Sequence, residues 1–142
     1  MLTAVTQTSP LPDAPITQEM TAEWPEIVMS VAPFLDEVQQ ELAGQVAAFN
    51  PEIAPYAEYA LANQGKQLRA PLTGLAANCV GGWNDSVIKV AVIIEMVHLA
   101  TLLHDDIMDG TELRRNRPTL ASKWDNTTAV LVGDCLFANA LR

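Results

Sequence analysis

The chain has 142 residues, a net charge of −9, and a composition that is 49% hydrophobic but only 6% aromatic. This is the length of one domain with room for a hydrophobic core, and the negative charge argues against nucleic-acid binding, which needs a basic face. The N-terminus lacks the basic and apolar regions of a secretory signal. No apolar run is both long enough and free enough of charge to cross a bilayer, so we expect a cytoplasmic protein without a transmembrane segment.

Hydrophobic periodicity predicts helices along most of the chain. Residues 1–23 are rich in Thr, Pro, Ser and Gln and are expected to form a flexible acidic tail, so that the folded domain spans residues 24–142. Apolar residues then recur every three or four positions from Trp24 to Val46, which predicts a helix that Pro33 interrupts or begins. Further helices are expected over residues 51–63, 68–79, 85–109, 118–124 and from 127 or 128 onward. No strand pattern persists, and the fold class is all-α.

The helix expected over residues 85–109 is the most apolar of the chain. Because it is apolar nearly all the way round, it should be buried within a larger assembly, and the chain alone should expose apolar surface and associate. At 100° per residue, His98, Asp105 and Asp109 lie within about 40° of each other, opposite Met96 and Leu103. Carboxylates on such a helix are costly unless they are compensated. This stripe should therefore face a polar cavity.

The run DDIMD, residues 105–109, is the strongest indication of function. Carboxylates this close repel one another and need a compensating cation. Mg²⁺ suits them, because it accepts one or two carboxylates and fills its other positions with water and substrate phosphate oxygens. Three arginines follow at once, and their planar guanidinium groups match phosphate geometry: Arg114, Arg115 and Arg117. The segment therefore predicts binding of a substrate that carries a diphosphate.

A second cationic pair lies upstream. Lys66 and Arg69 stand three residues apart at the expected start of a helix, where both can reach one anion and where backbone N–H groups also favour phosphate. Two alternatives stay open from the residues alone. The acids could form a solvated helix end, and the two cations could cap the preceding helix.

Four motifs, in this order, resemble the first half of the trans-type polyprenyl diphosphate synthases, also called isoprenyl diphosphate synthases. They are GKQLRAP at 65–71, EMVHLATLLHDDIMD at 95–109, RRNRPT at 114–119 and LVGDCLFANAL at 131–141. The resemblance covers roughly residues 30–142. It implies an isoprenoid synthase-type helical bundle that is incomplete, because the chain would hold only its first half.

The resemblance also implies roles for individual residues. In this family the first aspartate-rich motif binds Mg²⁺ and the allylic diphosphate. By position, Asp105 and Asp109 would be the metal ligands, with Asp106 beside them in the catalytic motif, and Arg114 would contact the allylic diphosphate. Isopentenyl diphosphate would be bound by Lys66, Arg69, His98 and Arg115.

The implied reaction lengthens an isoprenoid chain. Diphosphate leaves the allylic substrate, the isopentenyl double bond attacks the resulting carbocation, and loss of a proton regenerates an alkene one unit longer. Ala100 lies five residues before the first aspartate of the motif. A small residue there resembles longer-chain synthases, of the sort that feed quinone side chains.

The chain departs from the family in length. Members are more than twice as long, and the second aspartate-rich motif that they carry is not among these 142 residues. The first hypothesis is therefore a fragment or half-subunit of a prenyltransferase, which needs a complementary C-terminal half or forms a homo-oligomer. The alternative is a non-catalytic binding or regulatory subunit that pairs with a full-length synthase. A terpene cyclase would use similar acids without needing the GKQLR cations.

Overall fold

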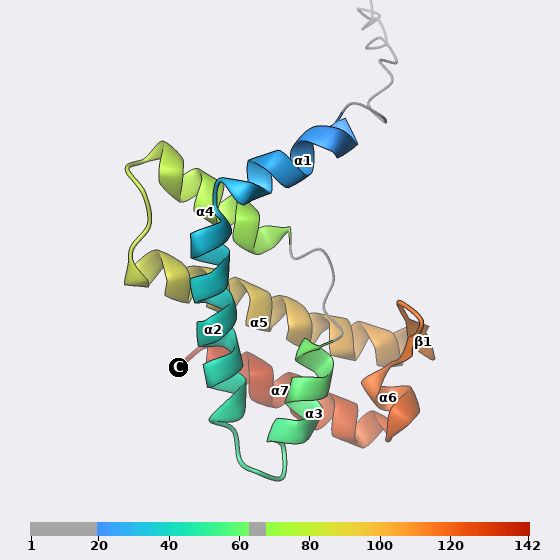
Figure 1. Ribbon diagram of the computed structural model, residues 1–142. Coiled ribbons are helices and arrows are strands. Elements are labelled where there is room, and N and C mark those ends of the chain that lie inside the picture. Colours follow the sequence, from blue (N-terminus) through green and yellow to red (C-terminus); the bar gives the residue numbers. More distant parts are fainter. Residues whose placement is uncertain (1–19, 63–67) are drawn as a thin grey trace, which may run out of the picture. The chain divides into compact units, whose positions relative to one another are not determined.

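A computed structural model describes residues 20–62 and 68–142, with side chains from Trp24 onward. The described residues confirm an all-α protein (Figure 1). The helices are α1 (Met20–Met29), α2 (Ala32–Ala47), α3 (Ala54–Leu61), α4 (Arg69–Cys79), α5 (Asp85–Met108), α6 (Leu120–Lys123) and α7 (Asn126–Ala140), and two short strands are β1 (Leu113–Arg114) and β2 (Arg117–Pro118).

The chain divides into two compact units, and α1 belongs to the first, which ends at Ser30. The hydrophobic pattern that runs from Trp24 to Val46 is therefore split between two helices. Pro33 lies in the first turn of α2, where a missing N–H group costs no hydrogen bond. The helix α1 begins at Met20, inside the segment that we expected to be a tail.

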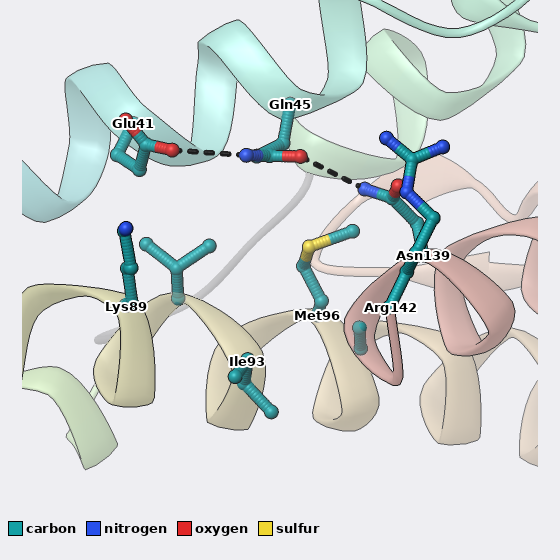
Figure 2. Close-up of a pocket in the computed structure, with 9 residues that line it drawn as sticks. Glu41, Gln45, Lys89, Ile93, Met96, Asn139 and Arg142 are labelled. Atoms are coloured by element: carbon teal, nitrogen blue, oxygen red, sulfur yellow. Dashed lines mark hydrogen bonds between the residues drawn. The ribbon is translucent and has the colours of Figure 1, made fainter. Parts of the chain in front are cut away.

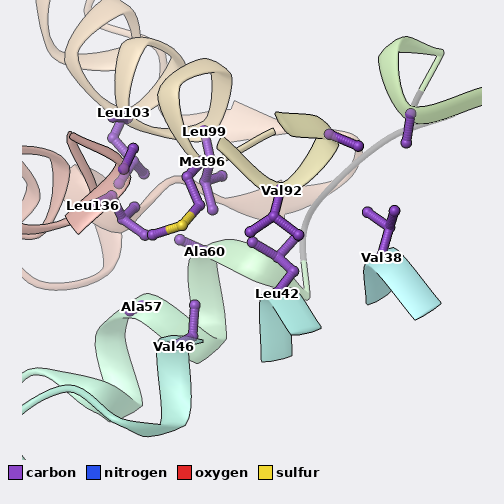
Figure 3. Packing of buried hydrophobic residues seen from close by; sticks show 14 of the residues in the cluster. Val38, Leu42, Val46, Ala57, Ala60, Val92, Met96, Leu99, Leu103 and Leu136 are labelled. Atoms are coloured by element: carbon purple, nitrogen blue, oxygen red, sulfur yellow. The ribbon is translucent and has the colours of Figure 1, made fainter. Parts of the chain in front are cut away.

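The second unit, residues 31–142, is built around α5. Helices α2, α4 and α7 all pack against α5, and α3 packs against α2 (Figure 1). The buried side chains of these helices meet in one core, drawn in Figure 3. Its members include Val38, Leu42 and Val46 of α2, Ala57 and Ala60 of α3, Val92, Met96, Leu99 and Leu103 of α5, and Leu136 of α7.

Both ends of α5 are capped by specific hydrogen bonds, made by a side chain at the N-terminal end and by the backbone at the C-terminal end. The Asn84 side chain accepts from the N–H groups of Ser86 and Val87, so Asn84 is the N-cap. We had expected the cap at Asp85 or Ser86. At the other end Gly110 has a φ of +62°, and Thr111 N–H donates to the Asp106 carbonyl at 2.8 Å. This is a Schellman motif, and it turns the chain back toward α5.

One face of α5 is buried and the other is exposed in the second unit. The buried face includes Met96 and Ala100, at 1% exposure each. The exposed face is also largely apolar, with Val90, Ile93, Ile94 and Met108. This exposed apolar surface is what we expected of the chain alone, and burial of α5 within a larger assembly stays a prediction. Within the described residues, α5 is also the one helix long and apolar enough to cross a membrane, a test that core helices of soluble proteins pass as well.

The two strands form a hairpin that the sequence did not predict. Arg114 pairs with Arg117 in antiparallel register, and the two residues between them have positive φ, 54° for Arg115 and 61° for Asn116. This is the geometry of a two-residue type I′ turn. Asn is one of the few residues other than Gly that tolerates this conformation, so Asn116 suits the turn.

A glycine allows α2 and α4 to approach closely. A Cβ atom at Gly74 in α4 would lie 2.6 Å from Cδ1 of Phe34, a fully buried side chain of α2. The Phe34 ring also packs edge-on against Trp83, with 5.5 Å between the ring centroids. The ring therefore has little room to move aside, and position 74 requires a residue without a side chain.

We predict opposite effects of alanine at two helical glycines. Gly74→Ala should lower the free energy of unfolding by about 1–3 kcal/mol, because it overpacks the Phe34 ring. Gly44→Ala should raise it by about 0.5–1 kcal/mol, because Gly44 lies inside α2 with no heavy atom within 4 Å of the added methyl group. Urea unfolding followed by circular dichroism measures both. Equal effects of the two substitutions would contradict the close approach of α2 and α4.

Candidate diphosphate and metal site

The C-terminal end of α5 presents two exposed carboxylates on one face. Asp105 and Asp109 are four residues apart, so they project from the same side of the helix one turn apart. Within the described ranges 20–62 and 68–142, neither forms an ion pair with Lys, Arg or His, and no group of three or more potential metal-ligating side chains occurs. Two carboxylates are what Mg²⁺ uses when water and phosphate oxygens complete its coordination.

Asp106 has a different environment from its two neighbours. It is 5% exposed, and its Oδ1 accepts from Nε of Arg114 at 2.9 Å and from Nη2 at 2.6 Å. The pair holds the guanidinium group in a fixed orientation beside the end of α5. The hydrogen bond to Asp106, followed by its charge, raises the pKa of Arg114, and desolvation opposes the rise. The catalytic role expected for Asp106 stays a prediction, but its carboxylate already has a strong partner.

The hairpin that carries Arg114 is closed at its base by Thr119. Thr119 is 1% exposed, its N–H donates to the Glu112 carbonyl at 2.9 Å, and its hydroxyl donates to the Thr111 carbonyl at 2.8 Å. Thr119 also caps α6. Arg115, in contrast, occupies the exposed turn.

His98 lies on α5 among the charges of three segments. It is half-buried, and its pKa is lowered by desolvation first and then by the positive charges of Arg69 in α4 and Arg114 in β1, while the charge of Asp105 opposes the shift. The charges that act on His98 thus come from three other residues that the sequence singled out: Arg69, Arg114 and Asp105. Lys66 lies outside the described residues.

The third arginine of the RRNRPT motif has a structural partner that sequence reasoning missed. Nη1 of Arg117 donates to the carbonyl of Ala62, and its guanidinium group lies over the ring of Tyr59 at 5.1 Å. The Tyr59 hydroxyl donates to the Pro118 carbonyl at 2.8 Å. The ring of Trp124 packs edge-on against Tyr59, and Lys123 lies over both rings. This cluster attaches the hairpin and α6 to the end of α3.

Two of the cavities bear on the site, one beside it and one away from it. A small one of about 30 Å³, room for a single water, is lined by Asp106, Arg114 and apolar side chains of α3, α5 and α6. A larger pocket of about 310 Å³ lies between α2, α5 and α7, where Gln45 donates to Glu41 and accepts from Asn139 (Figure 2). None of the residues predicted for the site lines this larger pocket.

The polyprenyl synthetase family model matches residues 50–142, which is more than half of the chain. The chain belongs to this family. The match includes the acidic motif, the hairpin and α7, and it confirms the resemblance that the four motifs indicated.

Individual relatives give the same assignment. A nonaprenyl diphosphate synthase of Rhodobacter capsulatus is 52% identical over 77 residues, which are 54% of this chain and 24% of that protein. Component 2 of the heptaprenyl diphosphate synthase of Bacillus subtilis is 38% identical over 108 residues, 75% of this chain and 31% of that protein.

Solved structures agree with the fold. A decaprenyl diphosphate synthase from Rhodobacter capsulatus superposes with a TM-score of 0.77 at 35% identity, covering 82% of this chain and 36% of that one. A polyprenyl synthase from Caulobacter crescentus, in complex with calcium and isoprenyl diphosphate, gives a TM-score of 0.76 at 36% identity with the same coverage. The chain therefore spans about a third of the length of its relatives, and its helices form an incomplete isoprenoid synthase bundle.

We predict that the pKa of His98 is below 6.5 and responds to its charged neighbours with opposite signs. Arg69→Gln removes a positive charge and should raise this pKa, whereas Asp105→Asn removes a negative charge and should lower it further. An NMR titration of the imidazole resonances measures both shifts. The chain has only two histidines, so a His104→Gln variant identifies the second signal. Shifts of the same sign in the two variants would show that His98 does not lie between these charges.

Proposed function

We propose that this chain supplies the diphosphate-binding half of a prenyltransferase that condenses isopentenyl diphosphate with an allylic diphosphate. One observation supports this above the others. The charges of Arg69 in α4 and Arg114 in β1 both lower the pKa of His98, and Asp106 holds the Arg114 guanidinium group beside the exposed end of α5 that carries Asp105 and Asp109. Cations beside two exposed carboxylates suit a ligand that is bound both by guanidinium groups and through a divalent ion.

The exposed carboxylates fit Mg²⁺ by their chemistry. Asp105 and Asp109 provide hard oxygen donors one helical turn apart, while Asp106 is occupied by Arg114. Asp105 and Asp109 would therefore hold the ion. When bound, Mg²⁺ would supply positive charge that stabilises a departing diphosphate.

The side chains of this chain would then bind and orient the two substrates. We assign Arg114 to the allylic diphosphate, because its orientation is fixed by Asp106 next to the proposed metal ligands. Four further residues are assigned to isopentenyl diphosphate: Lys66, Arg69, His98 and Arg115. Apolar residues on α5 such as Leu99 and Leu102 would exclude water from the carbocation. The C1–O bond of the allylic diphosphate would break as diphosphate leaves, and the terminal alkene carbon, C4, of isopentenyl diphosphate would bond to that C1. The resulting tertiary cation at C3 would lose a proton from C2, which forms the new double bond.

The reaction would require a complementary polypeptide that carries the second acidic motif. The curated relatives are more than twice as long as this chain, which matches about a third of their length, and α5 and α7 expose apolar side chains that such a polypeptide could cover. On α7 these include Val130, Leu131 and Phe137, and Leu141 follows as the C-cap. The small side chain of Ala100 supports a long polyprenyl product of the class used for quinone side chains.

We predict that turnover depends on the complementary half. The 142-residue chain, assayed alone with isopentenyl diphosphate, an allylic diphosphate and Mg²⁺, should release little product. Addition of a polypeptide equivalent to the missing two-thirds of a relative should restore chain elongation. The alternative of a non-catalytic subunit gives a different result, because the chain would then change the activity of a full-length synthase without gaining turnover from the complementary half.

We also predict that Asp105→Ala weakens Mg²⁺-dependent diphosphate binding by at least about tenfold, the scale of losing a contact to a charged group. Isothermal titration calorimetry with inorganic diphosphate and Mg²⁺ measures the change. Asp36→Ala is the matched control, because Asp36 is an exposed aspartate on α2. An affinity that is the same in all three proteins would rule out Asp105 as a metal ligand.

A further inference from the structure

A buried carboxyl group on α5 lies one turn before His98 and has no role in the proposed chemistry. Glu95 is 2% exposed, although it is an acid in a helix whose other buried residues are mostly apolar. A carboxylate at such a position is costly unless it is hydrogen-bonded. Its Oε1 accepts from the backbone N–H of Ala70 at 3.1 Å, in the first turn of α4.

In the part of the chain that the structure describes, the first turn of α4 takes this acceptor from another helix. The N-cap residue is Leu68, which has no side-chain acceptor, and no side chain of α4 caps its own N-terminus. Pro71 has no N–H group, and Leu72 donates to the Leu68 carbonyl. Ala70 is 2% exposed, so water cannot easily satisfy its N–H group. Among residues 20–62 and 68–142, Glu95 is therefore the acceptor of this buried donor.

The position of Ala70 determines the position of Arg69. The two residues are adjacent in the first turn of α4, and the charge of Arg69 reaches His98, which is three residues after Glu95 on α5. One turn of α5 thus carries both the histidine and the acceptor that fixes the backbone next to the arginine. Figure 1 shows α4 lying against the first half of α5.

We propose that Glu95 is a positioning residue for the isopentenyl diphosphate site, and that it acts through Arg69 by fixing the first turn of α4. This inference rests on the proposed function. It assigns Glu95 no contact with substrate or metal. The hydrogen bond from Ala70 is the feature that matters, so an amide oxygen in place of the carboxylate should largely preserve the effect.

Two substitutions distinguish the effect of the hydrogen bond to Ala70 from the effect of merely filling the buried position. Glu95→Gln keeps an acceptor oxygen of similar size, and Glu95→Leu removes it. Hydrogen–deuterium exchange of the Ala70 amide, measured by NMR on the 142-residue chain, should be at least about tenfold faster in the Leu variant and within about twofold of wild type in the Gln variant. Val132→Ala, a buried truncation in α7, is the control for general loosening and should leave the Ala70 amide unchanged.

Binding of isopentenyl diphosphate tests whether Glu95 acts through Arg69. Glu95→Leu should weaken binding about fivefold or more, and Glu95→Gln should restore nearly wild-type affinity. In an Arg69→Ala background, Glu95→Leu should cause no further loss, because residues that act as a unit are not additive. Equal losses in both backgrounds, or unchanged exchange of the Ala70 amide in the Leu variant, would overturn the proposal.

The two measurements distinguish this proposal from the function on which it rests. If the wild-type chain binds no isopentenyl diphosphate, the proposed function fails, while the exchange experiment still decides whether Glu95 anchors α4. If Glu95→Leu does not fold, Glu95→Met offers a more adaptable apolar side chain for the same comparison. If the Ala70 amide of a folded Glu95→Met variant exchanges as slowly as in the wild type, that result would also contradict the proposal that Glu95 fixes the first turn of α4.

Discussion

The ion pair between Asp106 and Arg114 is the contact on which the candidate site depends. It joins the end of α5 to a short hairpin, which has a two-residue ladder and a strained turn at Arg115. Without that pair the guanidinium group would sample many rotamers, and holding it in place would cost conformational entropy at the moment of binding. The buried carboxylate provides this order in advance.

The acids of α5 fall into two classes because of helical periodicity. Glu95 and Asp106 are eleven residues apart, which places them within about 20° of each other on the buried side. Each accepts hydrogen bonds from a segment that carries a cation: Glu95 from α4, Asp106 from the hairpin. Asp105 and Asp109 lie on the exposed side, where their carboxylates are available to a metal ion. A single helix thus separates acids that organise the site from acids that can bind a ligand.

The sequence predicted the helices well, and it also predicted which residues of α5 lie on opposite faces of that helix, because both follow from local hydrophobic periodicity. His98, Asp105 and Asp109 were already expected on one face, with Met96 and Leu103 opposite them, and Met96 and Leu103 are buried. The position of Gly110 also predicted the end of α5, since few residues other than glycine adopt its positive φ.

The contacts that the sequence did not predict are those between distant segments. The partner of Asp106 depends on a Schellman motif and a type I′ turn acting together, and no local pattern indicates their combined geometry. Glu95 was overlooked because a lone acid in an apolar helix gives no sign of which backbone N–H group it meets. The composition of α5 predicted burial only within a larger assembly, since periodicity reports how apolar a helix is and not which other segments cover it.

A crystal structure of the chain grown with Mg²⁺ and inorganic diphosphate would test the division of roles among the α5 acids most directly. The account predicts the ion at Asp105 and Asp109, the diphosphate against Arg114, and Asp106 still within hydrogen-bonding distance of that arginine. A structure in which Asp106 has left Arg114 to ligate the ion, with Asp105 or Asp109 turned to solvent, would contradict it.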